Sequence, residues 1–303
     1  METSKQKKKR RTKSKSRIKI LFLFIGFFTG FVMLFVFNAP FREALFKKVL
    51  GYDTPKNTCI LIVGQDSIKP LRSDTIILVF LNTEGNRIML YSVPRDSRFY
   101  VPDRERYDKI NHAYAFGGIK LLRKTLEEGL GISIPYFVEV DYQGFEKVID
   151  LLGGVEIEVE KRMKYQDKAQ NFSIDLVPGR QVLDGKKALQ YVRFRADKLG
   201  DIGRIKRQQK FLQALLDKME QLDNIVKAPE ILESLRSALV TNLQTEELVK
   251  IALWYRGLKE KDIRFVTMPG EPAYIEGISY WKPDFEEARR IILDFFDEEV
   301  SVS

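Results

Sequence analysis

An uncharged stretch of 22 residues, Ile20–Phe41, constrains this chain more than any other part of its sequence. A helix of this length measures about 33 Å at 1.5 Å per residue, enough to cross a hydrocarbon core about 30 Å thick. The stretch is longer than the apolar core of a cleaved signal peptide, and Phe37 stands where cleavage after Ala39 would need a small residue. We therefore expect an uncleaved transmembrane helix over residues 20–41, with a cleaved signal peptide as the alternative.

Residues 1–19 are strongly basic. They hold ten of the 51 Lys and Arg residues and one of the 42 acids, so residues 20–303 carry 41 of each. Positive charge beside a membrane helix keeps that end in the cytoplasm, which places the rest outside the membrane. We expect a single-pass protein of the cell membrane, with a cytoplasmic tail, a linker over 42–56 and an extracytoplasmic domain over 57–303. The absence of net positive charge in that domain argues against nucleic acid as a partner.

Two residues that occur once limit the chemistry. Cys59 is the only cysteine, so the exported domain has no internal disulfide, and its apolar neighbours predict a buried thiol. His112 is the only histidine, which excludes His-based metal clusters and Ser-His-Asp or Cys-His nucleophile sites. Catalysis would have to use carboxylates, arginines, hydroxyls and a hard cation.

Three acids stand at the ends of predicted strands. Apolar runs predict strands over 58–63, 75–81 and 87–93, with Asp66 shortly after the first. A hairpin centred near Gly85 would place Asp74 opposite a residue close to Asp96, to within one or two residues. Facing carboxylates repel each other unless a positive charge lies beside them.

These acids favour a hard cation. Carboxylates without histidine are typical of Mg²⁺, held by one or two carboxylates with substrate phosphate oxygens and water. Arg72 and Arg95 accompany the three acids in the sequence. The alternative is that each acid is an ordinary turn, strand-start or loop residue.

A dense group of basic residues lies in 191–209. If Val192 and Phe194 are buried in an extended segment, Arg193 and Arg195 point together to the opposite face.

The pattern becomes helical after Gly203, with Asp201 as the expected N-cap. The expected first turn carries Arg204, Arg207 and Gln208, and the apolar stripe carries Ile205, Leu212, Leu215, Leu216 and Met219. Arginine forks and free N–H groups at a helix start suit phosphate, so this segment predicts a phosphate or pyrophosphate cradle. A solvated basic helix face is the alternative.

The remaining elements predict the fold class. Helices are expected over 118–130, 142–152, 229–239, 245–258 and 283–296, with a further strand over 262–268. Hairpins mixed with strand-helix-strand units favour a three-layer α/β/α sandwich around a mixed central β-sheet, preceded by one transmembrane helix.

Several motifs resemble, in order and spacing, the LytR-CpsA-Psr family of bacterial envelope proteins. They are RSDTIILVFLN, GNRIMLYSVPRDS, DKINHAYAFGG, PYFVEVDYQGFEKVIDLLGGVEIEV, LDGKKALQYVRFRAD and GDIGRIKRQQ. The resemblance runs from Cys59 to Met219. The later segments TNLQTEELVKIA and MPGEPAYIEGISYWKPD are similar to the family's C-terminal continuation.

The resemblance implies a phosphotransferase that moves glycan phosphate from a polyprenyl-pyrophosphate-linked glycan, such as a teichoic-acid-like or capsular polymer, to peptidoglycan. It implies Mg²⁺ or Mn²⁺ at Asp66 and Asp74. The implied pyrophosphate ligands are Arg72, Arg95, Lys109, Arg193, Arg195, Arg204 and Gln208. Arg95, Asp96 and Asp201 are the implied catalytic residues. Asp201 would hold Arg204 in place by a salt bridge, and Asp96 would be a third carboxylate of the site or a base. The loop from Asp66 to Asp74 is short for the family, which weakens the assignment of Asp66.

A prenyl chain needs an apolar slot, for which the helices over 118–130 and 142–152 are candidates, ordinary core being the alternative. Two other functions also remain: a polyprenyl-diphosphate pyrophosphatase, in which water replaces the sugar acceptor, and a non-catalytic regulator that binds lipid pyrophosphate. Binding alone would not require paired carboxylates, which favours an enzyme.

Overall fold

The computed structural model describes residues 57–65, 73–167, 172–195, 200–220, 234, 237–255 and 258–297, all within the unit Thr54–Ser303. Among these residues no helix is both long enough and apolar enough to cross a membrane. The expected tail, membrane helix and linker lie outside the described part, as do most of the helix expected over 229–239 and the loop 66–72.

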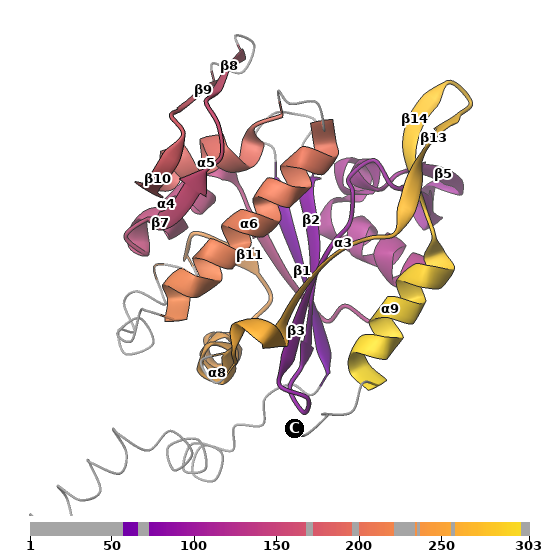
Figure 1. Ribbon diagram of the computed structural model, residues 1–303. Helices are drawn as coiled ribbons and strands as arrows, with labels where there is room; N and C mark the ends of the chain where they lie inside the picture. Colours follow the sequence, from indigo (N-terminus) through magenta and orange to yellow (C-terminus); the bar gives the residue numbers. More distant parts are fainter. Residues whose placement is uncertain are drawn as a thin grey trace, which may run out of the picture. The chain divides into compact units, whose positions relative to one another are not determined.

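A six-stranded mixed sheet forms the centre of the domain (Figure 1). Its strands, in spatial order, are β11 (Val240–Thr241), β6 (Tyr136–Val140), β1 (Thr58–Gln65), β2 (Ser73–Asn82), β3 (Arg87–Ser92) and β12 (Ile263–Thr267). β1, β2 and β3 are antiparallel neighbours, whereas β6 is parallel to β1 and β12 is parallel to β3.

Helices cover both faces of this sheet (Figure 1). One face packs on α3 (Ile110–Leu130) and α9 (Phe285–Asp297), and the other on α6 (Gly200–Glu220) and α8 (Thr245–Tyr255). Successive side chains of a strand point to opposite faces of the sheet. Leu61 and Val63 therefore face α3 and α9, whereas Ile60 faces α6 and α8. The expected sandwich around a mixed sheet is present, and Cys59 is buried in it as expected.

A second apolar core lies beside the main sheet. It joins α4 (Tyr142–Leu151) and α5 (Gly185–Arg193) to β7 (Val155–Val159), β8 (Met163–Asp167), β9 (Phe172–Leu176) and β10 (Gly179–Leu183). Phe211 of α6 is buried in this core, while Leu212 packs against the main sheet. α6 therefore fixes the second core to the first.

Two hairpins complete the described part, with two short 3-10 helices. The hairpins are β4 (Arg98–Val101) with β5 (Arg106–Lys109), and β13 (Gly270–Ile275) with β14 (Ile278–Pro283), and the 3-10 helices are Pro102–Arg104 and Glu260–Asp262. Figure 1 shows β13 and β14, in yellow, projecting beside β5. A bridge between Ser97 and Trp281 connects the two hairpins.

Most of the expected helices occur with shifted ends. α3 begins eight residues earlier than expected, because Asn111 and its neighbours continue the helix across a kink at Gly117 and Gly118, where Gly118 has φ +60°. α9 starts one residue after Asp284, whose carboxylate accepts the N–H of Glu287 at 3.0 Å. Such an N-cap bond satisfies an N–H group that the helix itself leaves open.

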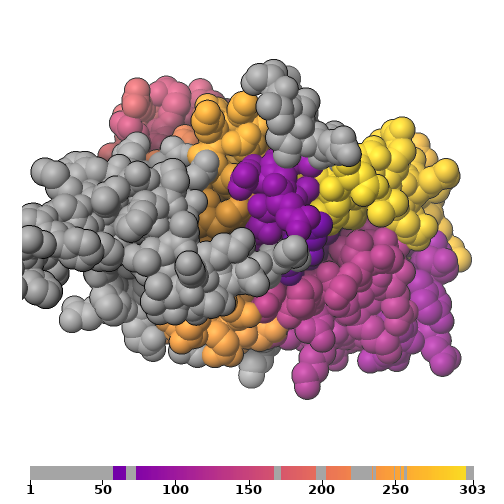
Figure 2. Space-filling model, turned by 90° about the horizontal axis from the view of Figure 1, so that it is seen from below, coloured from indigo at the N-terminus to yellow at the C-terminus, as the bar shows by residue number. Residues whose placement is uncertain are grey.

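One end of the sheet is closed by α8 and α9. Trp254 of α8 donates its indole N–H to Asn86 at 3.2 Å, and Arg87 donates to the Phe295 carbonyl oxygen at 3.2 Å. In Figure 2, the indigo turn between β2 and β3 lies between orange and yellow segments. The opposite end of these strands carries the charged residues.

We expect Gly185→Ala to destabilise the protein by about 1–3 kcal/mol, because a methyl group there overpacks the contact between α4 and α5. Its Cβ would lie 2.3 Å from the Glu146 carbonyl oxygen. Urea unfolding measures the change, and Lys186→Ala, at the exposed next position, is the control. Equal stability of the two variants would contradict this account of the packing.

Candidate active site

The β2–β3 register brings a carboxylate and a guanidinium face to face. Ile77 pairs with Ser92, and continuing the same register places Asp74 opposite Arg95. The expected partner of Asp74, a residue close to Asp96 to within one or two residues, is thus Arg95, because the hairpin is centred half a residue before Gly85. Arg95 Nη1 donates to Asp74 Oδ1 at 2.5 Å, so an ion pair stands where two acids would have repelled each other.

A second arginine reaches the same carboxylate from a distant segment. Arg195 Nη2 donates to Asp74 Oδ2 at 3.3 Å. Arg195 follows α5, whose C-cap residue is Phe194 in an extended conformation. Its side chain is 42% exposed, compared with 17% for Asp74, so a ligand can reach this guanidinium from solvent.

The pKa of Asp74 shows how strongly these cations act. Burial would raise this pKa, but the charges of Arg95, Arg195 and Arg204, with the hydrogen bond from Arg95, hold it below its usual value. Arg204 lies on the first turns of α6 and is 3% exposed. Asp74 is therefore ionised at neutral pH among three guanidiniums.

Asp96 belongs to the same network through a lysine. Lys109 Nζ donates to Asp96 Oδ1 at 2.9 Å, and Arg95 Nε lies 3.8 Å from Asp96 Oδ2. Lys109 stands at the N-cap position of α3. The residues Asp74, Arg95, Asp96, Lys109, Arg195 and Arg204 are called the ion-pair cluster below.

Glutamines fix the start of α6 over this end of the sheet. Gln208 Nε2 donates to Thr75 Oγ1 at 3.0 Å, next to Asp74. Gln209 Nε2 donates to Thr267 Oγ1 at 3.2 Å, and Arg207 donates to the Phe194 carbonyl oxygen at 2.5 Å. Gln209 is absent from the expected site, although its place directly after Gln208 in the sequence was a usable signal.

The segment that holds Arg193 is helical, which corrects the expected extended segment. α5 continues through Arg193, so the alternation of a strand does not apply there. The Arg193 guanidinium lies over the rings of Tyr142 at 4.3 Å and Phe172 at 3.9 Å, beside the second core.

Asp201 is also placed differently from its expected N-cap position. α6 begins at Gly200, so Asp201 lies within the first turn of the helix. The side chain of Asp201 lies outside the described part of the structure, and so do Asp66 and Arg72. The structure therefore describes no contact of these three residues.

The described residues supply part of a metal site. No group of three His, Cys, Asp or Glu side chains among them is arranged to hold a metal ion. Asp74 suits Mg²⁺ or Mn²⁺ as one ligand, because it is an ionised oxygen donor, and Mg²⁺ is commonly bound by one or two carboxylates with substrate phosphates.

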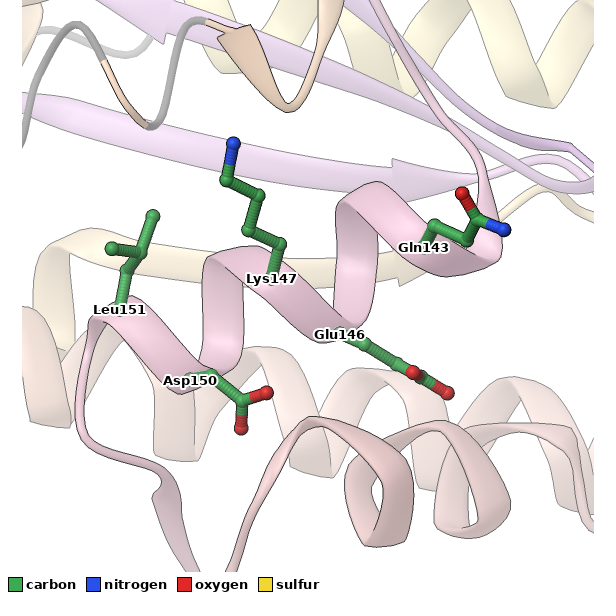
Figure 3. Close-up of a pocket in the computed structure, with 5 residues that line it drawn as sticks. All are labelled: Gln143, Glu146, Lys147, Asp150 and Leu151. Carbon is green, nitrogen blue, oxygen red and sulfur yellow. The ribbon is translucent and has the colours of Figure 1, made fainter.

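Two hollows border α4, and the second reaches Gln65 of β1, whose pairing partner Ser73 precedes Asp74. One of about 470 Å³ is lined by Gln143, Glu146, Lys147, Asp150 and Leu151 (Figure 3). Lys147 and Leu151 point to one side of the helix, and Glu146 and Asp150 to the other. The second, of about 300 Å³, shares Gln143 and Lys147 with the first. Charged groups of both signs line the first hollow, which does not suit a prenyl chain.

The helices considered for that chain bury their apolar stripes in the cores. Leu122 and Leu126 of α3 are buried in the main core, and Ile149 of α4 in the second. In the described part, these stripes are therefore ordinary core.

Comparison with known proteins identifies the family. A model of the LytR_cpsA_psr family matches residues 37–293. The chain belongs to this family. It is 38% identical to the regulatory protein MsrR of Staphylococcus aureus (strain Mu50 / ATCC 700699) over 219 residues, which are 71% of this chain and 65% of MsrR. The match thus spans just under two thirds of that relative.

A second relative is named as a transferase. The chain is 35% identical over 237 residues to the polyisoprenyl-teichoic acid–peptidoglycan teichoic acid transferase TagU of Halalkalibacterium halodurans. The match covers 77% of this chain and 76% of TagU.

Solved structures share the fold. B. subtilis TagV matches with a TM-score of 0.71 and 30% identity, covering 82% of this chain and all of TagV. TagT bound to LIIa-WTA matches with a TM-score of 0.67 and 28% identity, covering 80% of this chain and 92% of TagT. These matches confirm the family resemblance and the mixed α/β fold.

The ion pairs of Asp74 should make stability depend on pH. The pKa of Asp74 is lower in the folded chain than its ordinary value of 3.8. The ion pairs therefore stabilise the fold fully at pH values above 3.8. This stabilisation is lost as the pH falls through the pKa of the folded chain. Wild type should therefore lose more stability than Asp74→Asn between about pH 5 and about pH 2, measured by urea unfolding. Asp294→Asn, on the exposed side of α9, controls for loss of an acid. Equal losses in wild type and Asp74→Asn would contradict the prediction.

Proposed function

We propose that this chain is a membrane-anchored phosphotransferase that transfers glycan phosphate from a polyprenyl-pyrophosphate-linked glycan to peptidoglycan. The observation that carries the proposal is the convergence of Arg95, Arg195 and Arg204 on Asp74 from three separate segments. The name of TagU and the binding of LIIa-WTA by TagT support the same chemistry.

Phosphoryl transfer asks the protein for positioning and charge stabilisation more than for a covalent catalyst. In the proposed complex, the guanidiniums of Arg95 and Arg195 donate to oxygens of the pyrophosphate. Asp74 holds both guanidiniums in place before the substrate arrives, which lowers the cost of ordering them. Arg204 adds the positive charge of a buried guanidinium, and burial strengthens its effect.

Mg²⁺ or Mn²⁺, when bound, would neutralise part of the phosphate charge. Asp74 would be one ligand, with Asp66 as the second carboxylate of the proposed site. Asp96, held by Lys109, would accept a proton from an acceptor hydroxyl or orient Lys109 toward a phosphate.

The family resemblance implies further residues of the proposed site. Arg72 would contact the phosphates, and Asp201 would hold Arg204 by a salt bridge. Arg193 would also contact the phosphates, because a guanidinium that lies over the rings of Tyr142 and Phe172 keeps its in-plane N–H donors.

A substrate tethered in the bilayer explains the proposed anchor. The helix over 20–41 would hold the domain at the outer surface of the cell membrane, where a polyprenyl-linked donor and peptidoglycan are both within reach. The family match begins at residue 37, within that segment.

A non-catalytic regulator that binds lipid pyrophosphate is the second candidate, favoured by the name of MsrR as a regulatory protein. A regulator would bind the lipid without releasing polyprenyl phosphate, so product analysis separates the two functions.

Asp74→Ala should reduce release of polyprenyl phosphate from a lipid-linked glycan about 100-fold or more, because the loss frees the charges that position the phosphate. The control is Asp294→Ala, on the exposed side of α9, which should keep wild-type activity. Circular dichroism checks that the variants fold. An Asp74→Ala protein that is folded and as active as wild type would disprove the proposed role.

Peptidoglycan as acceptor distinguishes the transferase from a pyrophosphatase. With the full-length protein and a lipid-linked glycan, wall-linked product should form only when peptidoglycan is present. Equal release of polyprenyl phosphate with water alone, and no wall-linked product, would assign pyrophosphatase activity instead.

A further inference from the structure

A continuous series of cations and aromatic rings leads away from the ion-pair cluster. Lys109, which binds Asp96, lies with its Nζ 5.9 Å from the ring centre of Tyr280. The Arg98 guanidinium lies 6.0 Å from the same ring and 4.0 Å from the ring of Tyr107. This series, Lys109, Tyr280, Arg98, Tyr107 and Tyr100, is called the aromatic track.

The track ends on two exposed tyrosines. Tyr100 and Tyr107 are 45% and 52% exposed, and their ring centres lie 5.5 Å apart at an interplanar angle of 72°. They are paired residues on neighbouring strands, and Arg98 is paired with Lys109. Residues two apart share a face of a strand, so all four belong to one face of the β4–β5 hairpin. The other face buries Phe99 in the main core.

This face has the composition of a binding surface for a ligand with both apolar and anionic parts. Its four positions carry two tyrosines and two cations, and no acid. Arg98 makes no ion pair with a carboxylate among the described residues, and its position is fixed by rings instead. Tyrosine and arginine give large contact areas at low entropic cost, which is why they dominate binding hot spots.

We propose that the aromatic track binds the glycan part of the donor, an anionic sugar-phosphate chain. This inference rests on the proposed function. Sugar rings present an apolar face of C–H groups, which packs on the electron-rich face of a tyrosine ring. Phosphates between the sugars meet Arg98 and Lys109, so the alternation of rings and cations matches that of sugars and phosphates.

The direction of the track fits the chemistry of the site. The glycan leaves the pyrophosphate at the sugar end, and the track leaves the ion-pair cluster through Asp96 and Lys109. Tyr280 is 8% exposed, and Trp281 of β14 is bridged to Ser97 just before β4, so the β13–β14 hairpin supports the track from one side. Binding energy gained here, remote from the reacting phosphorus, would help to position the pyrophosphate.

The test measures binding of a lipid-free sugar-phosphate oligomer to the full-length protein in nanodiscs by calorimetry. The double variant Tyr100→Thr/Tyr107→Thr keeps residues suited to strands, and it should bind about tenfold more weakly than wild type. Arg98→Gln should also weaken binding. Tyr165→Thr is the matched control, because Tyr165 is 48% exposed on β8, and it should bind as wild type does.

A neutral N-acetylglucosamine oligomer of equal length separates donor from acceptor. If it binds and the sugar-phosphate oligomer does not, the track holds the acceptor strand and the proposal is wrong. Wild-type binding by the double variant, or no binding by wild type, also overturns it.

Asp74→Ala distinguishes this inference from the proposed function. It should abolish transfer yet keep oligomer binding, because Asp74 lies outside the track. Loss of transfer in Asp74→Ala together with unchanged oligomer binding by the track variants would refute the track and leave the proposed function standing. Unchanged transfer in Asp74→Ala would refute the function instead.

Discussion

The negative charge of Asp74 is the condition under which the arginines around it can lie together. Guanidiniums repel one another, and near a protein surface each such pair costs on the order of a few kcal/mol at close range. Asp74 offers one oxygen to Arg95 and the other to Arg195, and it lies in the field of buried Arg204. The cluster is therefore assembled before any phosphate binds, and a bound phosphate would meet cations already in place.

The layered fold is what brings these segments to one end of the sheet. β2 carries Asp74, the residues after β3 supply Arg95, the segment after α5 supplies Arg195, and α6 supplies Arg204. α6 is central to this arrangement, because Phe211 packs in the second core, Leu212 in the main one, and Gln208 bonds to Thr75 beside Asp74. A helix that packs in two cores has little freedom to move. The packing of both cores therefore fixes the position of the buried Arg204 near the start of α6.

The sequence predicted the elements that depend on a local pattern of apolar residues. It did not predict elements whose pattern is short or ambiguous, or contacts between distant segments. The sandwich, α4, α9 and β12 follow from apolar periodicity, and the motifs identified the family. The helical conformation of Arg193 was not predicted, because Val192 and Phe194 suit both a strand and the end of a helix. The four strands of the second core, β7 to β10, pair with one another. Each is only five residues long, so its alternation of apolar and polar residues is too short to distinguish it from a loop. The aromatic track depends on contacts between β4, β5 and β14, which no local pattern contains.

The length of the turn between β2 and β3 determines which residues face each other at the far end of these strands. It spans four residues between the paired Asn82 and Arg87, and Asn82 accepts the N–H of Gly85 at 2.7 Å. Because side chains alternate between faces, a slip of one residue would turn the whole of β3 over relative to its partner. A slip that draws Arg87 into this loop would pair Asn82 with Ile88 and would place Asp96, an acid, opposite Asp74 in place of Arg95. The same set of charged residues would then hold like charges where it now holds opposite ones.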